Sequence, residues 1–451
     1  MSVEQTPLNE RYETPLYKTL SAPIDVQLEL TEACNNRCLH CYNYWERGTP
    51  LLMRMDEFQI KGVVRELAEK RIFYLTITGG EPLLNPAPLL TAVKEAGNQG
   101  IIVSLNTNLT VVSENFLREL KDSGVRRILT SLVSFDQQTH DGITQRRGSF
   151  RETLLGIKAA QQVGFEVIVN MVVSKLNLNQ VYQTGVFCYR ELGVKHFCAT
   201  KASPSLYNQS WIREYGLTPF DLKNMLESLR RLKEDWGIEI DTLEPIPHCF
   251  FENPEQFYPL SKRRCVAALT TCTIGAGGEI RPCSHTEKSY GNIFKEGLEN
   301  AWGKMAQWRT GELIPYKCKD CEELATCGGG CRVSAAYTHN GDYSAEDPFM
   351  IKPPLVARRL FPKRKSPELA SSRLRLIPSL RTRKEEFGGI IDNSSGRSLL
   401  VNERSFALIG KLRGKTFSLA ELSQQEEVSL EELSHFFSYL WENNFIEEVK
   451  G

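Results

Sequence analysis

Hydrophobic positions along the first two hundred residues follow two spacings in turn. Short apolar runs at 25–31, 72–78, 101–106, 127–134, 167–173 and 195–199 are typical of buried strands. Segments between them, such as 55–69, 113–122 and 150–162, place apolar residues at helical spacing. Strands alternating with helices predict a parallel α/β sheet. Six such units are too few for a closed eight-stranded barrel, so we expect a partial (β/α)6 barrel with its site at the C-terminal strand ends.

The pattern changes after this region. Residues 218–236 predict a connecting helix, and the Cys- and Gly-rich stretch at 245–350 predicts a small domain stabilised by metal. Eleven Lys or Arg residues, one acidic residue and several prolines between 352 and 384 are typical of a linker. Strand-like runs at 388–391 and 398–401 predict a hairpin, and helical patterns follow at 403–412, 418–424 and 429–443.

These changes divide the chain into five parts. We expect an N-terminal extension (1–22), the barrel (23–217), a connecting helix with the Cys-rich domain (218–350), a basic linker (351–384) and a C-terminal winged-helix-like domain (385–451). The formal net charge is zero, which argues against nucleic-acid or membrane binding by the chain as a whole. Without a long apolar run or an apolar signal segment at the N-terminus, the sequence predicts a cytoplasmic protein.

Thirteen cysteines are many for a reducing compartment, where clustered thiols indicate metal or redox chemistry. Three of them, Cys34, Cys38 and Cys41, follow the first predicted strand. Three thiolates from one loop can hold three irons of a cubane and leave the fourth iron open. A zinc site is the alternative, although His40 is poorly spaced to be the fourth ligand that zinc requires. Cys188, Cys198 and Cys249 stand apart from the clusters and are expected to be buried apolar side chains.

The C-x3-C-x2-C spacing of this loop resembles the hallmark of the radical SAM superfamily. The segment 78–83, Thr-Gly-Gly-Glu-Pro-Leu, resembles the GGEP motif of the same family. The resemblance implies a [4Fe–4S] cluster and S-adenosylmethionine (SAM), and it implies further contacts to SAM for which a capping or strand-end role is the alternative. The residues concerned are Gly79, Gly80, Glu81 and Pro82 at the methionine amino group, Ser134 at the ribose, His40 near the adenine, and Asn108, Arg147 and Asn170 by position. Where the family has a glycine after Asn108, this chain has Leu109.

Seven more cysteines lie between 265 and 331, and their spacing resembles the SPASM extension, which carries two auxiliary iron–sulfur clusters. The resemblance implies a first auxiliary cluster on Cys265, Cys272, Cys283 and Cys331, and a second on Cys318, Cys321 and Cys327. Phe349 and Met350 follow Asp347-Pro348 where the family has a last cysteine. Asp347, another side chain or the substrate would then complete the second cluster, or the cluster is altered or absent. Zinc is the alternative for Cys318-x2-Cys321.

The region from Arg381 to Gly389, with the hairpin and helices that follow, resembles the peptide-recognition elements of ribosomal-peptide maturation, which are similar to the pyrroloquinoline quinone peptide chaperone. Such an element binds a leader peptide as an added strand, and the basic stretch before it would favour an acidic leader. A DNA-binding winged helix and an inert packing domain are the alternatives.

Together these resemblances imply an oxidoreductase that cleaves SAM reductively and uses the 5′-deoxyadenosyl radical to modify a ribosomally made peptide by crosslinking, decarboxylation, backbone excision or a related oxidation. They imply two partners, a precursor peptide and an electron donor such as flavodoxin or ferredoxin. Binding to a membrane or to nucleic acid is not expected. A maturase of a folded partner protein and a zinc-stapled nucleic-acid-binding regulator are the alternatives. The sequence identifies no catalytic acid or base.

Overall fold

The computed structural model describes residues 18–43, 52–205, 207–253, 256–257, 260–351, 369 and 372–449. The chain forms two compact units. We call Ala22–Arg359 the barrel unit, and Met1–Ser21 together with Leu360–Gly451 the terminal unit. Residues 352–368, which hold the Pro-containing start of the expected linker, lie outside the described residues.

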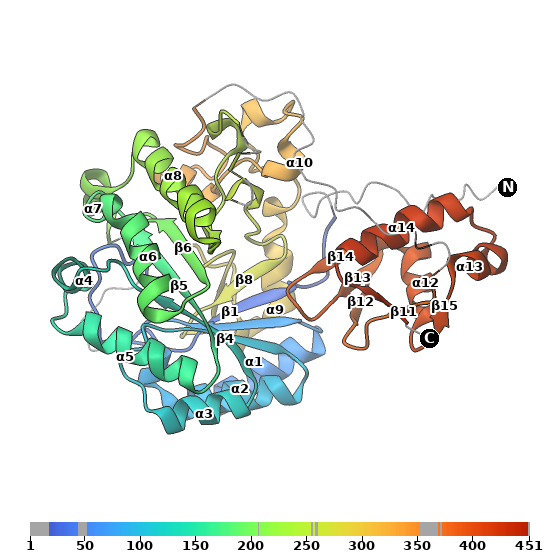
Figure 1. The fold of residues 1–451 in the computed structure, drawn as a ribbon, viewed down its shortest axis with the longest axis horizontal. Helices are drawn as coiled ribbons and strands as arrows, with labels where there is room; N and C mark the ends of the chain where they lie inside the picture. Colours follow the sequence, from blue (N-terminus) through green and yellow to red (C-terminus); the bar gives the residue numbers. More distant parts are fainter. Residues whose placement is uncertain are drawn as a thin grey trace. The chain divides into compact units, whose positions relative to one another are not determined.

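A ten-stranded sheet forms the centre of the barrel unit, in the order β10-β9-β8-β1-β2-β3-β4-β5-β6-β7 (Figure 1). Strands β1 to β7 pair in parallel and β8 joins β1 in parallel, whereas β9 and β10 pair antiparallel. The six predicted strands are confirmed as β1 to β6, and the partial barrel with them. The bounds are β1 Asp25–Glu29, β2 Tyr74–Thr78, β3 Ile102–Asn106, β4 Val125–Ser131, β5 Glu166–Val173, β6 His196–Lys201, β7 Glu239–Asp241, β8 Thr271–Ile274, β9 Glu279–Arg281 and β10 Gly291–Asn292.

Helices follow the strands of the barrel and lie along the outside of the sheet (Figure 1). Their sequences contain the expected start signals: Asp56 begins α1 with a capping box, and Thr218 begins α8 in the same way. The bounds are α1 Glu57–Glu69, α2 Pro86–Asn98, α3 Glu114–Asp122, α4 Gln137–Thr144, α5 Ser149–Gln162, α6 Val181–Leu192, α7 Gln209–Tyr215 and α8 Pro219–Trp236, then α9 Ile293–Lys304, α10 Leu324–Cys327 and α11 Arg332–Thr338 in the Cys-rich region. None of the described helices combines the length and apolar character required to cross a bilayer.

The Cys-rich region shares the barrel's sheet. Strand β8 pairs with β1 in parallel, from Asp25 beside Thr271 to Leu28 beside Ile274. The adjoining strand β9 ends at Arg281, a fully buried residue whose guanidinium pairs with the buried carboxylate of Glu29 at the end of β1. Since β1 leads into the loop that carries Cys34, this pairing places the Cys-rich region beside that loop.

Two small sheets and three helices form the terminal unit. The sheets have the orders β15-β11-β16 and β12-β13-β14. Their apolar faces and the helices enclose one core that includes Ile391, Val401, Leu408, Phe436 and Phe437. The bounds are β11 Leu374–Leu376, β12 Arg381–Glu385, β13 Gly388–Asp392, β14 Ser398–Asn402, α12 Glu403–Leu412, β15 Thr416–Phe417, α13 Leu419–Glu426, α14 Leu430–Glu442 and β16 Ile446–Glu448.

This unit departs from the sequence interpretation at its beginning. Strands β11 and β12 lie within the stretch that we expected to be a linker. Two arginines of β12 form ion pairs, Arg381 with Asp392 and Arg383 with Glu385, so part of the basic charge is neutralised inside the fold. The end of the N-terminal extension also packs here: Leu20 is buried, and the backbone N–H of Ser21 donates to Glu385 at 2.8 Å.

Candidate metal and cofactor centre

Three cysteines lie in one loop directly after β1. We call residues 32–43 the cysteine loop. The thiols of Cys34, Cys38 and Cys41 are all half-buried. The N–H of Asn36 donates to the Cys34 sulfur at 3.4 Å, and the N–H of Cys41 donates to the carbonyl of Cys38 at 3.2 Å. A compact loop therefore presents all three thiols at the C-terminal end of the first barrel strand.

The backbone just after β2 holds the start of the cysteine loop through Gly80 and Glu81. The N–H of Gly80 donates to the Thr31 carbonyl at 2.6 Å, and the N–H of Glu81 donates to the Ala33 carbonyl at 2.8 Å. A β-carbon on Gly79 would lie 2.4 Å from the Thr31 oxygen, and one on Gly80 would lie 2.2 Å from the Ala33 oxygen. The close approach that these glycines allow is thus to the chain's own backbone, beside Cys34.

Glu81 connects the ends of two strands, β2 and β3, through one buried carboxylate. It accepts hydrogen bonds from the Thr107 hydroxyl at 2.6 Å, the Asn108 N–H at 2.7 Å and the Leu83 N–H at 3.0 Å. Burial raises the pKa of Glu81 to about 7, against the effect of these bonds. Pro82 begins the 3₁₀ turn Pro82–Leu84, which Glu81 caps. In this structure Glu81 ties β2 to the loop after β3.

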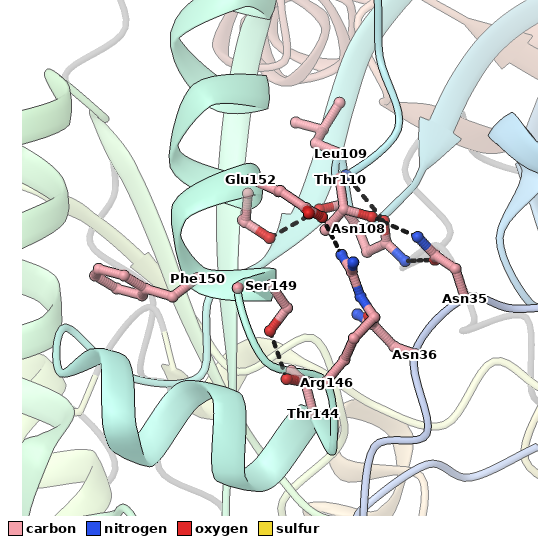
Figure 2. Close-up of polar contacts among 12 residues, drawn as sticks. Asn35, Asn36, Asn108, Leu109, Thr110, Thr144, Arg146, Ser149, Phe150 and Glu152 are labelled. Carbon is pink, nitrogen blue, oxygen red and sulfur yellow. Dashed lines mark hydrogen bonds and ion pairs between the residues drawn. The ribbon is translucent and has the colours of Figure 1, made fainter.

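A polar network then joins the loop after β3 to the cysteine loop (Figure 2). The Asn108 amide donates to the Asn35 carbonyl oxygen at 2.8 Å, and the Asn35 amide donates to the Thr110 hydroxyl at 2.8 Å. The Thr110 hydroxyl in turn donates to Asn108 at 2.7 Å. This closed triangle fixes the residue next to Cys34, so Asn108 positions the cysteine loop.

The turn after Asn108 has a left-handed residue, although this chain has Leu109 where the radical SAM family has a glycine. Leu109 adopts φ +56°, the left-handed conformation that glycine adopts without strain. The Leu109 side chain is fully buried, and α5 has Gly156 at the point of contact. A β-carbon on Gly156 would lie 2.0 Å from the Leu109 carbonyl oxygen and 2.8 Å from its β-carbon. The turn is therefore accommodated by a glycine in the neighbouring helix.

Arg146, the neighbour of the predicted SAM contact Arg147, reaches the cysteine loop. The Arg146 guanidinium donates to the Asn36 side chain at 2.7 Å and pairs with Glu152 (Figure 2). Arg147 is exposed. The end of α4 also binds the loop by backbone, because the Arg37 N–H donates to the Thr144 carbonyl at 3.0 Å.

The remaining predicted SAM contacts lie at strand ends or in the loop. Ser134 is fully buried; it accepts from the Asp136 N–H at 2.8 Å and bonds to Gln180. Asn170 is buried on β5 and accepts from the Thr200 hydroxyl at 2.8 Å. His40 is buried within the cysteine loop. Ser134 and Asn170 therefore make local hydrogen bonds, and their contacts to SAM stay predictions.

In the Cys-rich region, Cys265, Cys283 and Cys331 form a first thiol group. Burial raises the pKa of the Cys283 thiol to about 12, and the negative charges of the Cys265 and Cys331 thiolates add to this effect. Cys272, predicted to join them, is fully buried inside β8 opposite Val26. Burial raises the pKa of its thiol, and the charged neighbour that adds to this effect is Asp25. The place of Cys272 in the first auxiliary cluster stays a prediction.

Cys318, Cys321 and Cys327 form a second thiol group and line one pocket. Cys249 lines the same pocket and is half-buried, which corrects the expectation that it is a buried apolar side chain. Cys188 and Cys198 are fully buried, as that expectation required.

The donor sets suit iron–sulfur clusters. Within the described ranges, no three His, Cys, Asp or Glu side chains converge closely enough to hold a single metal ion. A cubane presents a separate iron to each thiolate, so its ligands stand further apart than those of one zinc ion. All three groups consist of cysteine thiols, which are the usual protein ligands of iron–sulfur clusters.

Sequence reasoning missed a set of charged and aromatic residues near the first thiol group. Lys201, at the end of β6, forms a buried ion pair with Glu244 at 2.7 Å. Burial opposes its charge, but Glu244, Cys331 and Asp347 together keep the pKa of Lys201 above its usual value. The ring of His285 lies 4.2 Å from that of Tyr42 in the cysteine loop. The sequence signal that could have identified Lys201 is its position just after the predicted strand at 195–199.

Comparison with known proteins supports this interpretation of the site. The radical SAM superfamily model matches residues 28–187, and an iron–sulfur cluster-binding domain, SPASM, matches residues 265–322. The AdoMet-dependent heme synthase of Methanosarcina barkeri is 26% identical over 350 residues, which cover 74% of this chain and 98% of that protein. The PqqA peptide cyclase of Bradyrhizobium diazoefficiens is 25% identical over 355 residues, 75% of this chain and 88% of that protein.

The fold has a counterpart among solved structures. SuiB of Streptococcus suis, bound to its precursor peptide SuiA, superposes with a TM-score of 0.59. It shares 18% sequence identity, and the match covers 74% of this chain and 77% of that chain.

Proposed function

The chain is a radical SAM enzyme with a SAM-binding [4Fe–4S] cluster and SPASM auxiliary clusters, and from this premise we propose that it modifies a ribosomally made peptide. Bound together, cluster and SAM supply a 5′-deoxyadenosyl radical. The thiols of Cys34, Cys38 and Cys41 would hold three irons and leave one free for SAM. The electron donor, a flavodoxin or ferredoxin, stays a prediction.

The chain's own residues position this site. The backbone of Gly79 to Pro82 lies against the cysteine loop, and we propose that it also borders the methionine end of SAM. Asn35, Asn108 and Arg146 hold the loop in place. His40, buried in the same loop, is our candidate for packing near the adenine. Lys201, at the end of β6, and its buried partner Glu244, which follows β7, would exclude water and orient a substrate over the barrel mouth.

The terminal unit is the main structural support for a peptide substrate. In its β12-β13-β14 sheet, the outer strands β12 and β14 each pair with β13 alone among the described strands. An outer strand of a sheet can take an extended peptide as an added strand. The similarity to a PqqA peptide cyclase supports a peptide substrate.

The test uses the full-length, reconstituted enzyme and a synthetic copy of any short peptide encoded beside the gene. Binding is measured by fluorescence anisotropy, and product by mass spectrometry after dithionite and SAM are added. We expect binding, release of 5′-deoxyadenosine and a mass change in the peptide. Release of 5′-deoxyadenosine with an unchanged peptide would contradict the proposal.

Heme formation is the second candidate, because the similarity to an AdoMet-dependent heme synthase covers 98% of that protein. The same reconstituted enzyme is tested with the porphyrin precursor of that synthase. Heme formation there, with no change in the peptide, would favour this function.

A further inference from the structure

Four thiols from two separate segments meet at one pocket in the barrel unit. The pocket is lined by Cys249, Cys318, Cys321 and Cys327, with Lys317 and Met350 among its other walls. Cys249 lies far upstream of the other three in the sequence and outside the SPASM match at 265–322. Tertiary structure, not local spacing, brings it to this group.

The turn that carries Cys249 is anchored to the second thiol group. It is the 3₁₀ turn His248–Phe250. The His248 ring is buried, with Nδ1 3.1 Å from a Glu323 carboxylate oxygen and Nε2 2.8 Å from the Ser261 carbonyl oxygen. Glu323 lies between Cys321 and Cys327, and the N–H of His248 donates to the Cys327 sulfur at 3.3 Å. The position of Cys249 is therefore fixed by the loop that supplies the other thiols.

The alternatives for a fourth ligand are otherwise engaged. Both carboxylate oxygens of Asp347 accept backbone N–H groups, from Cys331 at 2.6 Å and from Phe349 at 2.8 Å. The Phe349 ring packs on Phe250 with centroids 6.3 Å apart. Met350 does reach the pocket, with its sulfur 4.0 Å from that of Cys318, but a thioether is a weak, neutral acceptor, whereas these clusters are held by thiolates.

We propose that Cys249 is the fourth ligand of the second auxiliary cluster, which Cys318, Cys321 and Cys327 hold from the other side. The cluster is then closed by four thiolates, and none of its irons is open to substrate. Four-thiolate ligation also keeps its reduction potential lower than a non-cysteine ligand would.

The experiment counts clusters and needs no substrate. The parent protein carries Cys34→Ala, Cys38→Ala and Cys41→Ala, so that auxiliary clusters alone contribute iron. Cys249→Ala is added, and iron, zinc and acid-labile sulfide are measured after anaerobic reconstitution, with EPR spectra of the oxidised and reduced protein. We expect the iron content to fall by roughly one to four atoms per chain, with either a three-iron EPR signal or loss of one cluster's signal. Cys188→Ala, which removes a buried thiol of α6, is the matched control and should keep the parent values.

Two further variants keep the proposal falsifiable if Cys249→Ala fails to fold. Cys249→Ser offers an oxygen ligand, and we expect a retained cluster with a changed EPR spectrum and a raised potential. Met350→Ala should leave the iron content at the parent value. Parent iron, sulfide and EPR spectra in the folded Cys249 variants would overturn the proposal, as would a loss of iron in Met350→Ala that matches the loss in Cys249→Ala. These readouts do not depend on the peptide substrate, so they fail or succeed separately from the proposed function.

Discussion

Leu109, in the loop after β3, combines backbone strain with close packing of its side chain. Leu109 holds a left-handed turn that costs about 1–2 kcal/mol for a non-glycine residue. Its buried side chain contributes more, because removing a buried leucine costs about 2–5 kcal/mol. The packing of the side chain therefore outweighs the backbone strain, which explains why the fold accepts leucine here.

Replacing Leu109 with glycine tests this balance. We expect Leu109→Gly to lower the free energy of unfolding by roughly 1–3 kcal/mol, since the lost burial exceeds the relieved strain. Anaerobic chemical unfolding of the reconstituted protein gives the value. A more stable Leu109→Gly protein would show that backbone strain outweighs side-chain packing at this turn. Gly156→Ala, which places a methyl group against the Leu109 carbonyl, should also be destabilising.

Glu81 should make stability depend on pH. Burial raises its pKa in the folded protein to about 7, from an ordinary value of 4.5, so the folded state holds this proton more tightly than the unfolded state does. The contribution is fully present below about pH 4.5 and is lost as the pH rises towards 7.

The difference between wild type and Glu81→Gln isolates this group from the other buried carboxyls. We expect the wild-type free energy of unfolding to fall relative to the variant between about pH 5 and 7, with a limiting slope of about 1.4 kcal/mol per pH unit. Chemical unfolding at several pH values measures both proteins. Parallel pH profiles would mean that Glu81 titrates normally.

At the level of elements, the cysteine loop is held from three sides. The backbone of Gly80 and Glu81 binds Thr31 and Ala33. The triangle of Asn35, Asn108 and Thr110 links the cysteine loop to the loop after β3, and Arg146, in the turn between α4 and α5, binds Asn36. A loop that must hold a cluster by three thiols benefits from such supports, because misplaced ligands loosen a metal site.

Arg146 and its exposed neighbour Arg147 provide a paired test of this support. We expect Arg146→Ala to lose iron to a chelator several-fold faster than wild type, because Asn36 loses its partner. Arg147→Ala should change the rate much less. The loss is followed by absorbance near 400 nm. The reverse order of the two rates would show that Arg146 does not support the cysteine loop.

At the level of the whole molecule, we propose different roles for the two units. The matches to known families at 28–187 and 265–322 both lie in the barrel unit. The terminal unit has its own apolar core. Cluster chemistry and peptide capture are thus assigned to different parts of the chain.

A chain limited to residues 22–359 tests this division. We expect it to keep the iron content of the full chain and to release 5′-deoxyadenosine, but to bind the candidate peptide at least tenfold more weakly. Iron analysis, chromatography and fluorescence anisotropy provide the three measurements. Unchanged peptide affinity would place peptide recognition in the barrel unit instead.

The sequence by itself determined the features that depend on local order. Apolar periodicity predicted strands β1 to β6 and the helices between them, because a strand or helix buries one face at a fixed spacing. The spacing of Cys34, Cys38 and Cys41 predicted a three-thiol loop, since all its ligands come from eight consecutive residues.

Tertiary structure decided which distant residues meet. Strand β8 joins β1, and Cys249 reaches the second thiol group. Gly156 makes room for Leu109, and Arg146 rather than Arg147 contacts the loop. No local pattern specifies these contacts, because long-range packing sets which side chains from separate segments face each other.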